Sequence, residues 1–211
     1  LTSILVTHHH PDHVGGIPAL LRERDIPVYG PARETIPGMT HPLAEGDTIQ
    51  PAGVDMTLAV MEVPGHTLGH IAFHDTDRCW LFCGDTLFAG GCGRLFEGTP
   101  AQMFDSLQRL ASLPAKTQVF CTHEYTLANL TFAAAVTPDD DAVAKRLDTV
   151  RQAREAGQIT LPSTLEEEVR SNPFLRAHEP TLKRACEARE AGTAGSDMQC
   201  FAALRRWKDN F

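Results

Sequence analysis

Residues 8–13 place four side chains of metal-binding types within six positions: His8, His10, Asp12 and His13. Side chains alternate along an extended segment, so His8 and His10 can point the same way, whereas Asp12 and His13 fall at the turn into a predicted helix. Imidazole and carboxylate groups are typical ligands of zinc and similar first-row metals. Four ligands packed this closely along the chain are more than one tetrahedral ion conveniently takes from so short a segment, and the cluster therefore favours two ions.

Three further residues of the same types each follow a predicted apolar strand: His66, Asp85 and His123. Neighbouring strands can end at one edge of a sheet, so the loops that follow them can converge on one place. A single such residue is most often a turn or capping residue. Several that converge favour a metal site.

An alternation of strands and a helix must position these residues. Apolar and β-branched runs predict strands, and apolar residues at helical spacing predict a helix over 14–24. The predicted strands are 3–7, 27–31, 56–63, 71–74, 79–83 and 118–121. A further helix starts at Thr99, where Thr-Pro-Ala-Gln combines a capping box with proline at the first helical position. Residues 89–94 form a glycine-rich loop.

The pattern changes after Cys121, beyond which no convincing strand is predicted. Helical spacing and proline punctuation predict a series of helices instead. The predicted helices are 126–135, 140–156, 165–170, 180–190 and 197–208. The sequence therefore predicts an α/β part followed by an all-helical part.

Charge and composition exclude some functions. The 211 residues carry a net charge of −8, whereas nucleic acids and anionic membranes require a basic surface, so neither partner is expected. Residues 1–125 hold nine of the ten histidines and 7 basic against 14 acidic residues, a net of −7 that suits cation binding. Six cysteines without a Cys-x-x-Cys pair, and no apolar run of transmembrane length, predict a cytoplasmic protein with reduced thiols.

Four segments hold the candidate ligands: Thr-His-His-His-Pro-Asp-His at 7–13, Pro-Gly-His-Thr-Leu-Gly-His at 64–70, Gly-Asp-Thr-Leu-Phe at 84–88 and Thr-His-Glu-Tyr-Thr at 122–126. These segments resemble the metal motifs of the metallo-β-lactamase superfamily, and more narrowly those of the glyoxalase II, or hydroxyacylglutathione hydrolase, family. The resemblance implies an αββα sandwich followed by a C-terminal helical domain. It divides the chain into a metal-binding domain over 1–126 and a helical, glutathione-substrate-binding domain over 127–211. Family members carry further strands before the first motif, so from Leu1 onward the sandwich is expected to lack its N-terminal strands.

The resemblance also implies two ligand sets for two divalent ions, with zinc expected and iron or manganese as alternatives. One set is His8, His10 and His66; the other is Asp12, His13 and His123; Asp85 bridges both. A hydroxide between the metals is the nucleophile, and Asp12 and Asp85 are the catalytic residues. Thiols have a pKa near 8.5, so a thiolate can leave from a thioester without a dedicated general acid.

The implied substrate is an S-2-hydroxyacylglutathione, with S-D-lactoylglutathione expected, and the products are glutathione and D-lactate. This reaction belongs to methylglyoxal detoxification. The resemblance assigns glutathione binding to Arg94, Tyr125, Arg205 and Lys208, in a protein expected to be a monomer. Some family members have tyrosine at the position of Phe96, which cannot supply a hydroxyl.

Other functions remain open on the same residues. A persulfide dioxygenase shares the fold and uses one iron, and a β-lactam hydrolase or a lactonase needs no C-terminal arginine and lysine. Another thioesterase of the same fold is a further alternative. A non-catalytic metal-binding protein is a third class. Among the remaining polar residues, His9 is expected to have a structural role, and Thr67 and His70 are expected to support His66.

Overall fold

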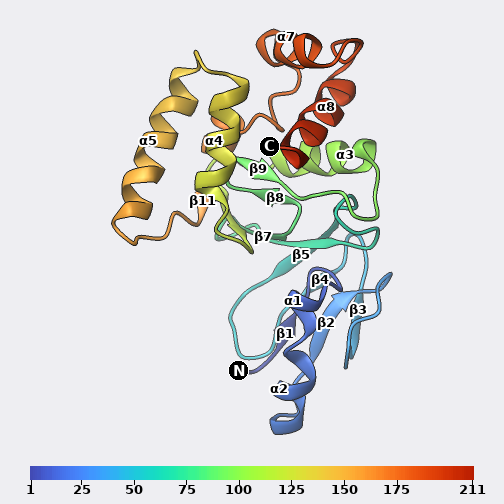
Figure 1. The fold of residues 1–211 in the computed structure, drawn as a ribbon. Coiled ribbons are helices and arrows are strands. Elements are labelled where there is room, and N and C mark those ends of the chain that lie inside the picture. Colours follow the sequence, from blue (N-terminus) through green and yellow to red (C-terminus); the bar gives the residue numbers. More distant parts are fainter.

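The computed structural model describes residues 1–211, whose strands form two main sheets with helices on the outer faces (Figure 1). The smaller sheet has the order β1-β2-β3 and parallel pairing throughout. Its strands are β1 (Ile4–Leu5), β2 (Val28–Pro31) and β3 (His41–Leu43). Two short helices, α1 (Pro11–Val14) and α2 (Ile17–Glu23), connect β1 to β2. Val14 and Ile17 from these helices form an apolar cluster with Val6 and Val28, which fixes the helices to one face of this sheet.

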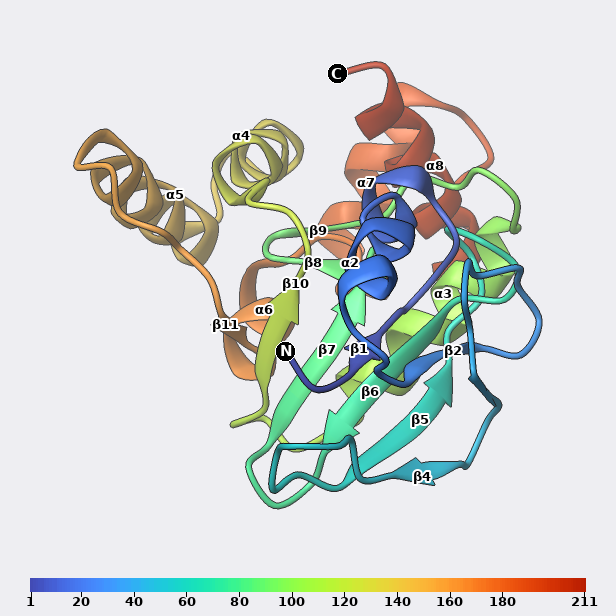
Figure 2. The same cartoon turned by 90° about the horizontal axis from the view of Figure 1, so that it is seen from below.

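The larger sheet has six strands in the order β11-β10-β7-β6-β5-β4, and Figure 2 shows its strands side by side. They are β4 (Thr48–Ile49), β5 (Leu58–Glu62), β6 (Ile71–Asp75), β7 (Trp80–Gly84), β10 (Gln118–Cys121) and β11 (Ser163–Thr164). β10 runs parallel to β7, and the remaining pairs are antiparallel.

Alternating residues of the larger sheet enter two separate cores. Phe73 belongs to a cluster that also contains Leu43 of the smaller sheet, so this cluster lies between the sheets. Ala72 and Leu81 instead join the main core of 22 buried residues, together with Leu107 of α3 (Pro100–Ala111). Because side chains alternate across a strand, both faces of this sheet are covered, and the layers are helix, sheet, sheet and helix.

The C-terminal part contains five helices besides β11, and all of them except the second contribute buried side chains to the main core. They are α4 (Thr126–Val136), α5 (Asp141–Glu155), α6 (Leu165–Ser171), α7 (Pro180–Arg189) and α8 (Asp197–Asp209). α8 packs on α3, where the rings of Phe104 and Phe201 lie 5.7 Å apart. α4 and α5 form a helical hairpin, with α5 on the outside (Figures 1 and 2). No helix has both the length and the apolar character needed to cross a membrane.

The fold class predicted from the sequence is confirmed, but three local predictions are wrong. The helix predicted over 14–24 is interrupted at Gly15 and Gly16, which separate α1 from α2. The glycine-rich loop forms a small hairpin of β8 (Leu87–Phe88) and β9 (Gly91–Cys92). A strand does occur beyond Cys121, because β11 pairs antiparallel with β10.

Candidate metal centre

The seven residues singled out for metal binding all follow strands or lie on α1. His8 and His10 follow β1, and His66, Asp85 and His123 come after β5, β7 and β10. The fold brings their ligand atoms into two groups, in each of which the atoms lie within 4.8 Å of one another. One group is His8, His10 and His66, and the other is Asp12, His13 and His123; a further set of His8, His13 and Asp85 overlaps both.

Asp85 lies between the two groups. Its Oδ1 is 3.3 Å from Nε2 of His13, and its Oδ2 is 3.6 Å from Nε2 of His66 and 3.5 Å from Nε2 of His123. A single carboxylate therefore faces histidines of both groups, as a bridging ligand must.

The hydrogen bond made by one ring nitrogen of His66 determines which of its nitrogens can bind a metal. Nδ1 of His66 donates to the Arg94 carbonyl at 2.7 Å, so Nε2 of a neutral His66 carries a lone pair. Three buried polar atoms of the site have no hydrogen-bond partner: Nε2 of His8, Nε2 of His13 and Oδ1 of Asp85. Buried polar atoms are rarely left unpaired, so this donor set fits a bound cation.

Burial sets the charge state of the site. It lowers the pKa of His8 and of His66, which favours neutral imidazoles that can act as ligands. Burial alone raises the pKa of the Asp85 carboxyl, but the contact with His13 and the nearby histidines outweigh it and lower that pKa. At His13, burial lowers the pKa but the contact with Asp85 outweighs it and raises that pKa. The site therefore combines neutral imidazoles at His8 and His66 with an ionised carboxylate at Asp85.

The backbone around Asp85 is shaped by two glycines and a buried histidine. Gly84 has φ +50°, and a Cβ at Gly93 would lie 1.9 Å from the Asp85 carbonyl oxygen. Nε2 of His70 accepts a hydrogen bond from the Asp85 N–H at 3.1 Å, and burial lowers the pKa of His70 to about 3. His70 thus contacts Asp85 and stacks on His8 at 4.6 Å, and its ring also lies edge-on to that of His66 at 6.2 Å.

A cleft of about 390 Å³ opens over the two groups. It is lined by His10, Pro11, Asp12, His66, Asp85, Phe96, His123 and Tyr125. Tyr125 stacks on His123 with ring centroids 4.9 Å apart, and the Phe88 ring lies edge-on to Tyr125 at 5.4 Å. Phe96 is 62% exposed and approaches the rings of His10 and His66 edge-on, so aromatic side chains flank the cleft on both sides.

The basic residues predicted to bind substrate occupy different environments. The Arg205 guanidinium is buried, donates to the Cys92 carbonyl at 2.9 Å and pairs with Asp209 at 2.9 Å. Arg94 is exposed and also contacts Asp209, at 3.3 Å. Nζ of Lys208 lies 3.4 Å from the Ala128 carbonyl, on the face of α8 toward α4. Sequence reasoning missed Asp209, the carboxylate that joins two of these cations.

The layered fold and the paired histidine groups define a metallo-β-lactamase fold. The Metallo-beta-lactamase superfamily model matches residues 1–123, and the model of the Hydroxyacylglutathione hydrolase C-terminus matches residues 124–211. The chain is 54% identical over 210 residues to a hydroxyacylglutathione hydrolase of Nitrosomonas europaea, covering 99% of this chain and 79% of that protein. It is 53% identical to one of Pseudomonas fluorescens, covering 100% of this chain and 81% of that protein. The chain belongs to the hydroxyacylglutathione hydrolase family of the metallo-β-lactamase superfamily.

Solved structures show the same fold. The crystal structure of ETHE1 from Myxococcus xanthus has a TM-score of 0.65 and 24% identity, with 98% of this chain and 68% of that chain covered. TTHA1623 in a di-iron-bound form has a TM-score of 0.55 and 32% identity, with 82% of this chain and 77% of that chain covered. Membership of the superfamily implies binding of divalent metal ions, which agrees with the donor set described above.

Proposed function

We propose that this protein hydrolyses the thioester bond of S-2-hydroxyacylglutathiones, with S-D-lactoylglutathione as the substrate and glutathione and D-lactate as the products. This reaction would serve methylglyoxal detoxification. The observation that carries the proposal is the position of Asp85 between two histidine-rich groups at the base of an open cleft. The relatives named hydroxyacylglutathione hydrolase, which match nearly the whole chain, support the same activity.

The ligand assignment follows the two groups. His8, His10 and His66 hold one divalent ion, Asp12, His13 and His123 hold the second, and Asp85 contacts both. Zinc is the proposed metal because nitrogen and carboxylate ligands suit it, and the di-iron form of TTHA1623 makes iron an alternative. When bound, two such ions supply Lewis-acid activation of a water and of the thioester carbonyl.

The chain's own residues orient the reactants. The Asp12 side chain is 60% exposed and its Oδ2 lies 3.5 Å from Nε2 of His123, so it can accept a hydrogen bond from a water in the cleft. Tyr125, stacked on His123, forms one wall beside the reacting carbonyl. The leaving thiolate needs little protonation because thiols have a pKa near 8.5.

Glutathione binding is assigned to Arg94, Tyr125, Arg205 and Lys208. The exposed Arg94 and the half-buried Lys208 can pair with the carboxylates of glutathione. Arg205 is buried, so it contributes by holding the Cys92 carbonyl and Asp209 below the bound substrate. We also propose that the 1–126 and 127–211 segments act as the metal-binding and substrate-binding domains of a monomer. A cytoplasmic location is supported by six cysteines that are all free thiols.

A direct assay tests the activity. Release of free thiol from S-lactoylglutathione is measured for the zinc-loaded chain and for two variants. His66→Ala should lose metal and most of the activity, because His66 belongs to the first ligand group. The double variant Arg205→Ala plus Lys208→Ala should raise KM far more than it lowers kcat, and a wild-type KM in that variant would exclude the assigned glutathione site.

A further inference from the structure

His9, Glu34 and Glu97 form a cluster beside the metal centre and come from three separate loops. His9 stands between two residues of the first ligand group, Glu34 follows β2, and Glu97 lies between β9 and α3. Nδ1 of His9 is 3.0 Å from Oε2 of Glu34, and Nε2 is 3.2 Å from Oε1 of Glu97. Both ring nitrogens of His9 thus face a carboxylate, and the His9 ring lies edge-on to that of His10 with centroids 5.2 Å apart.

The same two carboxylates hold the loop that carries His66. Oε1 of Glu34 accepts hydrogen bonds from the Thr67 hydroxyl and from the Gly69 N–H, the latter at 3.1 Å. Leu68, which lies between Thr67 and Gly69, donates its N–H to Oε2 of Glu97 at 2.9 Å. Three consecutive residues after His66 are therefore fixed by carboxylates that also face the first metal motif.

The loop after His66 is shaped to fit around Glu34. The Glu34 side chain is only 3% exposed, and a buried carboxylate is costly unless it is paired. A Cβ at position 69 would lie 2.5 Å from Cγ of Glu34, so Gly69 permits the close approach of this loop. The first metal motif carries His10, and the loop held by Glu34 follows His66. Nε2 of His66 lies 3.0 Å from Nδ1 of His10.

We propose that Glu34 is a positioning residue that joins the first two metal motifs through His9 and residues 67–69. By fixing the separation of His10 and His66, it sets the cation affinity of the first ligand group, His8, His10 and His66. The second group, Asp12, His13 and His123, makes no contact with this cluster and depends on it little. This inference rests on the metal ligands of the proposed function. Contacts that orient ligands from behind are typically worth about 10- to 100-fold in metal affinity.

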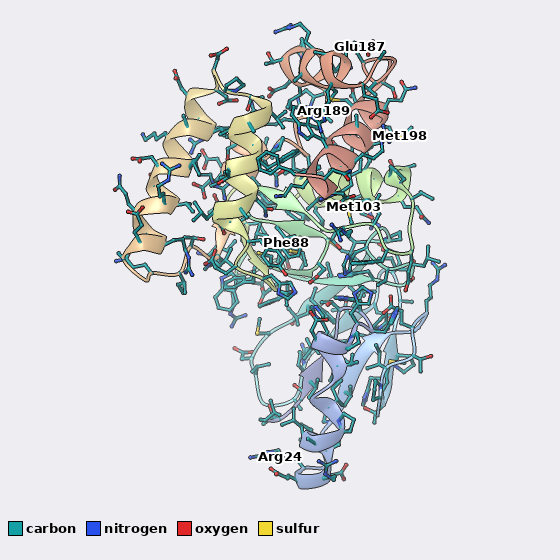
Figure 3. The ribbon with its side chains drawn as sticks, viewed as in Figure 1. Arg24, Phe88, Met103, Glu187, Arg189 and Met198 are labelled. Carbon is teal, nitrogen blue, oxygen red and sulfur yellow. The ribbon has the colours of Figure 1, made fainter.

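The test compares Glu34→Gln with a matched control in the full chain. Glutamine keeps the shape of the side chain and removes its charge. The control is Glu187→Gln, because Glu187 also accepts backbone N–H groups of a loop but lies on α7, far from β1 and α1 (Figure 3). Zinc affinity is measured by competition with a chromogenic chelator. In Glu34→Gln, one of the two zinc ions should bind with about 10- to 100-fold lower affinity than in the wild type. Glu187→Gln should bind both ions with wild-type affinity.

Two backgrounds assign the weakened site. In His123→Ala, which leaves the first group intact, adding Glu34→Gln should lower zinc affinity by the same factor. In His66→Ala, which leaves the second group, it should change the affinity less than twofold. Equal losses in both backgrounds, unchanged affinity in both, or more than two zinc ions per wild-type chain would overturn the positioning role.

A second variant covers the case in which Glu34→Gln does not fold. The Glu97 side chain is 33% exposed, so Glu97→Gln should perturb folding less than Glu34→Gln does. It should lower the affinity for the same zinc ion. Melting temperatures of the metal-free proteins are compared as well. A merely structural role would lower the melting temperature without lowering the affinity for one zinc ion more than for the other. Zinc binding is measured without substrate, so it tests the positioning role of Glu34 independently of activity. The proposed function is tested separately, and a wild-type chain without thioesterase activity would refute it.

Discussion

Arg205 donates from Nη1 to the backbone carbonyl of Cys92 at 2.9 Å, although 113 residues separate them in the chain. The contact ties the last helix, α8, to the β8–β9 hairpin. The next residues after Cys92 are Gly93, which lies against the Asp85 carbonyl, and Arg94, whose carbonyl contacts His66. The helical part of the chain therefore supports the metal centre from behind through this hairpin.

Removing this contact should destabilise the protein. Arg205→Ala leaves the buried Cys92 carbonyl and part of Asp209 without a donor, so we expect a loss of about 2–3 kcal/mol in the free energy of unfolding. Urea denaturation of the metal-free chain measures it. The control is Arg206→Ala on the same helix, whose exposed pair with Glu190 should be worth less than about 1 kcal/mol. Equal losses in the two variants would argue against a special role for the Cys92 contact.

Glu168 should be among the most sensitive positions in the helical part. Its buried carboxylate pairs with Arg146 at 2.5 Å and accepts the Gly90 N–H of the hairpin turn at 2.8 Å. Glu168→Ala removes the nearest carboxylate from the buried Arg146 guanidinium, which keeps only the longer contact with Glu167 at 3.5 Å and the Ser171 hydroxyl. We therefore expect a loss of about 3 kcal/mol in the free energy of unfolding, measured by urea denaturation. Exposed Glu166 on the same helix offers a control, for which Glu166→Ala should cost less than about 1 kcal/mol. A Glu168→Ala cost that small would show that water reaches Arg146.

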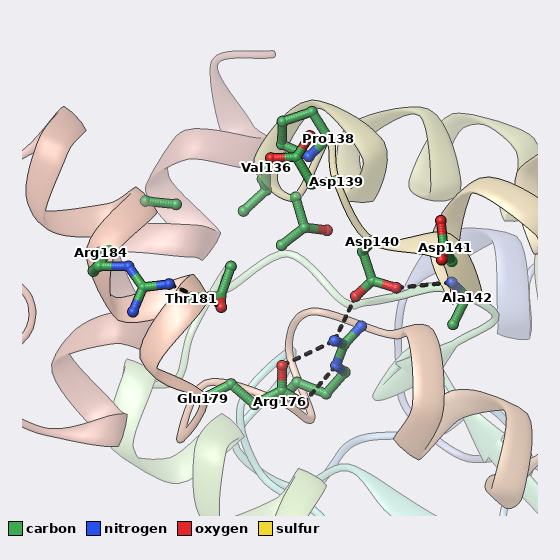
Figure 4. Close-up of a pocket in the computed structure, with 12 residues that line it drawn as sticks. Val136, Pro138, Asp139, Asp140, Asp141, Ala142, Arg176, Glu179, Thr181 and Arg184 are labelled. Carbon is green, nitrogen blue, oxygen red and sulfur yellow. Dashed lines mark hydrogen bonds and ion pairs between the residues drawn. The ribbon is translucent and has the colours of Figure 1, made fainter.

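The pair of Asp140 with Arg176 should make stability depend on pH (Figure 4). Burial alone raises the pKa of Asp140, but its hydrogen bond with Arg176 at 2.5 Å outweighs burial and lowers that pKa below the ordinary value. A lowered folded-state pKa contributes stability above the unfolded pKa, near 3.9, and this contribution is lost as the pH falls through the folded value. Asp140→Asn keeps the helix cap and should cost about 1–2 kcal/mol at pH 7.

The difference between wild type and Asp140→Asn should shrink as the pH is lowered below about 4. Urea denaturation of the metal-free chain at a series of pH values follows it. Asp139→Asn, at the exposed neighbouring position, provides the control and should show no such trend. A difference that stays constant down to low pH would mean that Asp140 is not held ionised by Arg176.

Gly93→Ala should damage the metal centre itself. The new Cβ would lie 1.9 Å from the Asp85 carbonyl oxygen, so the backbone that carries Asp85 must move. We expect metal content to fall below one ion per chain and thioesterase activity to fall by more than tenfold. Gly16→Ala is the control, because a Cβ there meets nothing within 4 Å. Full metal occupancy in Gly93→Ala would show that the loop can shift without moving Asp85.

Much of the secondary structure could be predicted from local patterns. The five helices after residue 125 begin and end within one or two residues of the predicted limits, because proline, capping and apolar spacing are local signals. The strands β3, β4 and β11 were missed because two or three residues carry no measurable period, and their existence depends on the strands they pair with.

The sequence by itself determined which seven side chains have the chemistry to bind metal, and the resemblance of four motifs predicted the family to which the chain belongs. Their role as ligands stays a prediction, but the fold does bring them into two groups around Asp85. Only the tertiary structure decided what surrounds them: Glu34 and Glu97 beside His9, Asp209 between two arginines, and Arg205 beneath the hairpin. The physical reason is that ligand type is a property of each residue, whereas burial and pairing depend on segments that meet only when both sheets and the helices have packed.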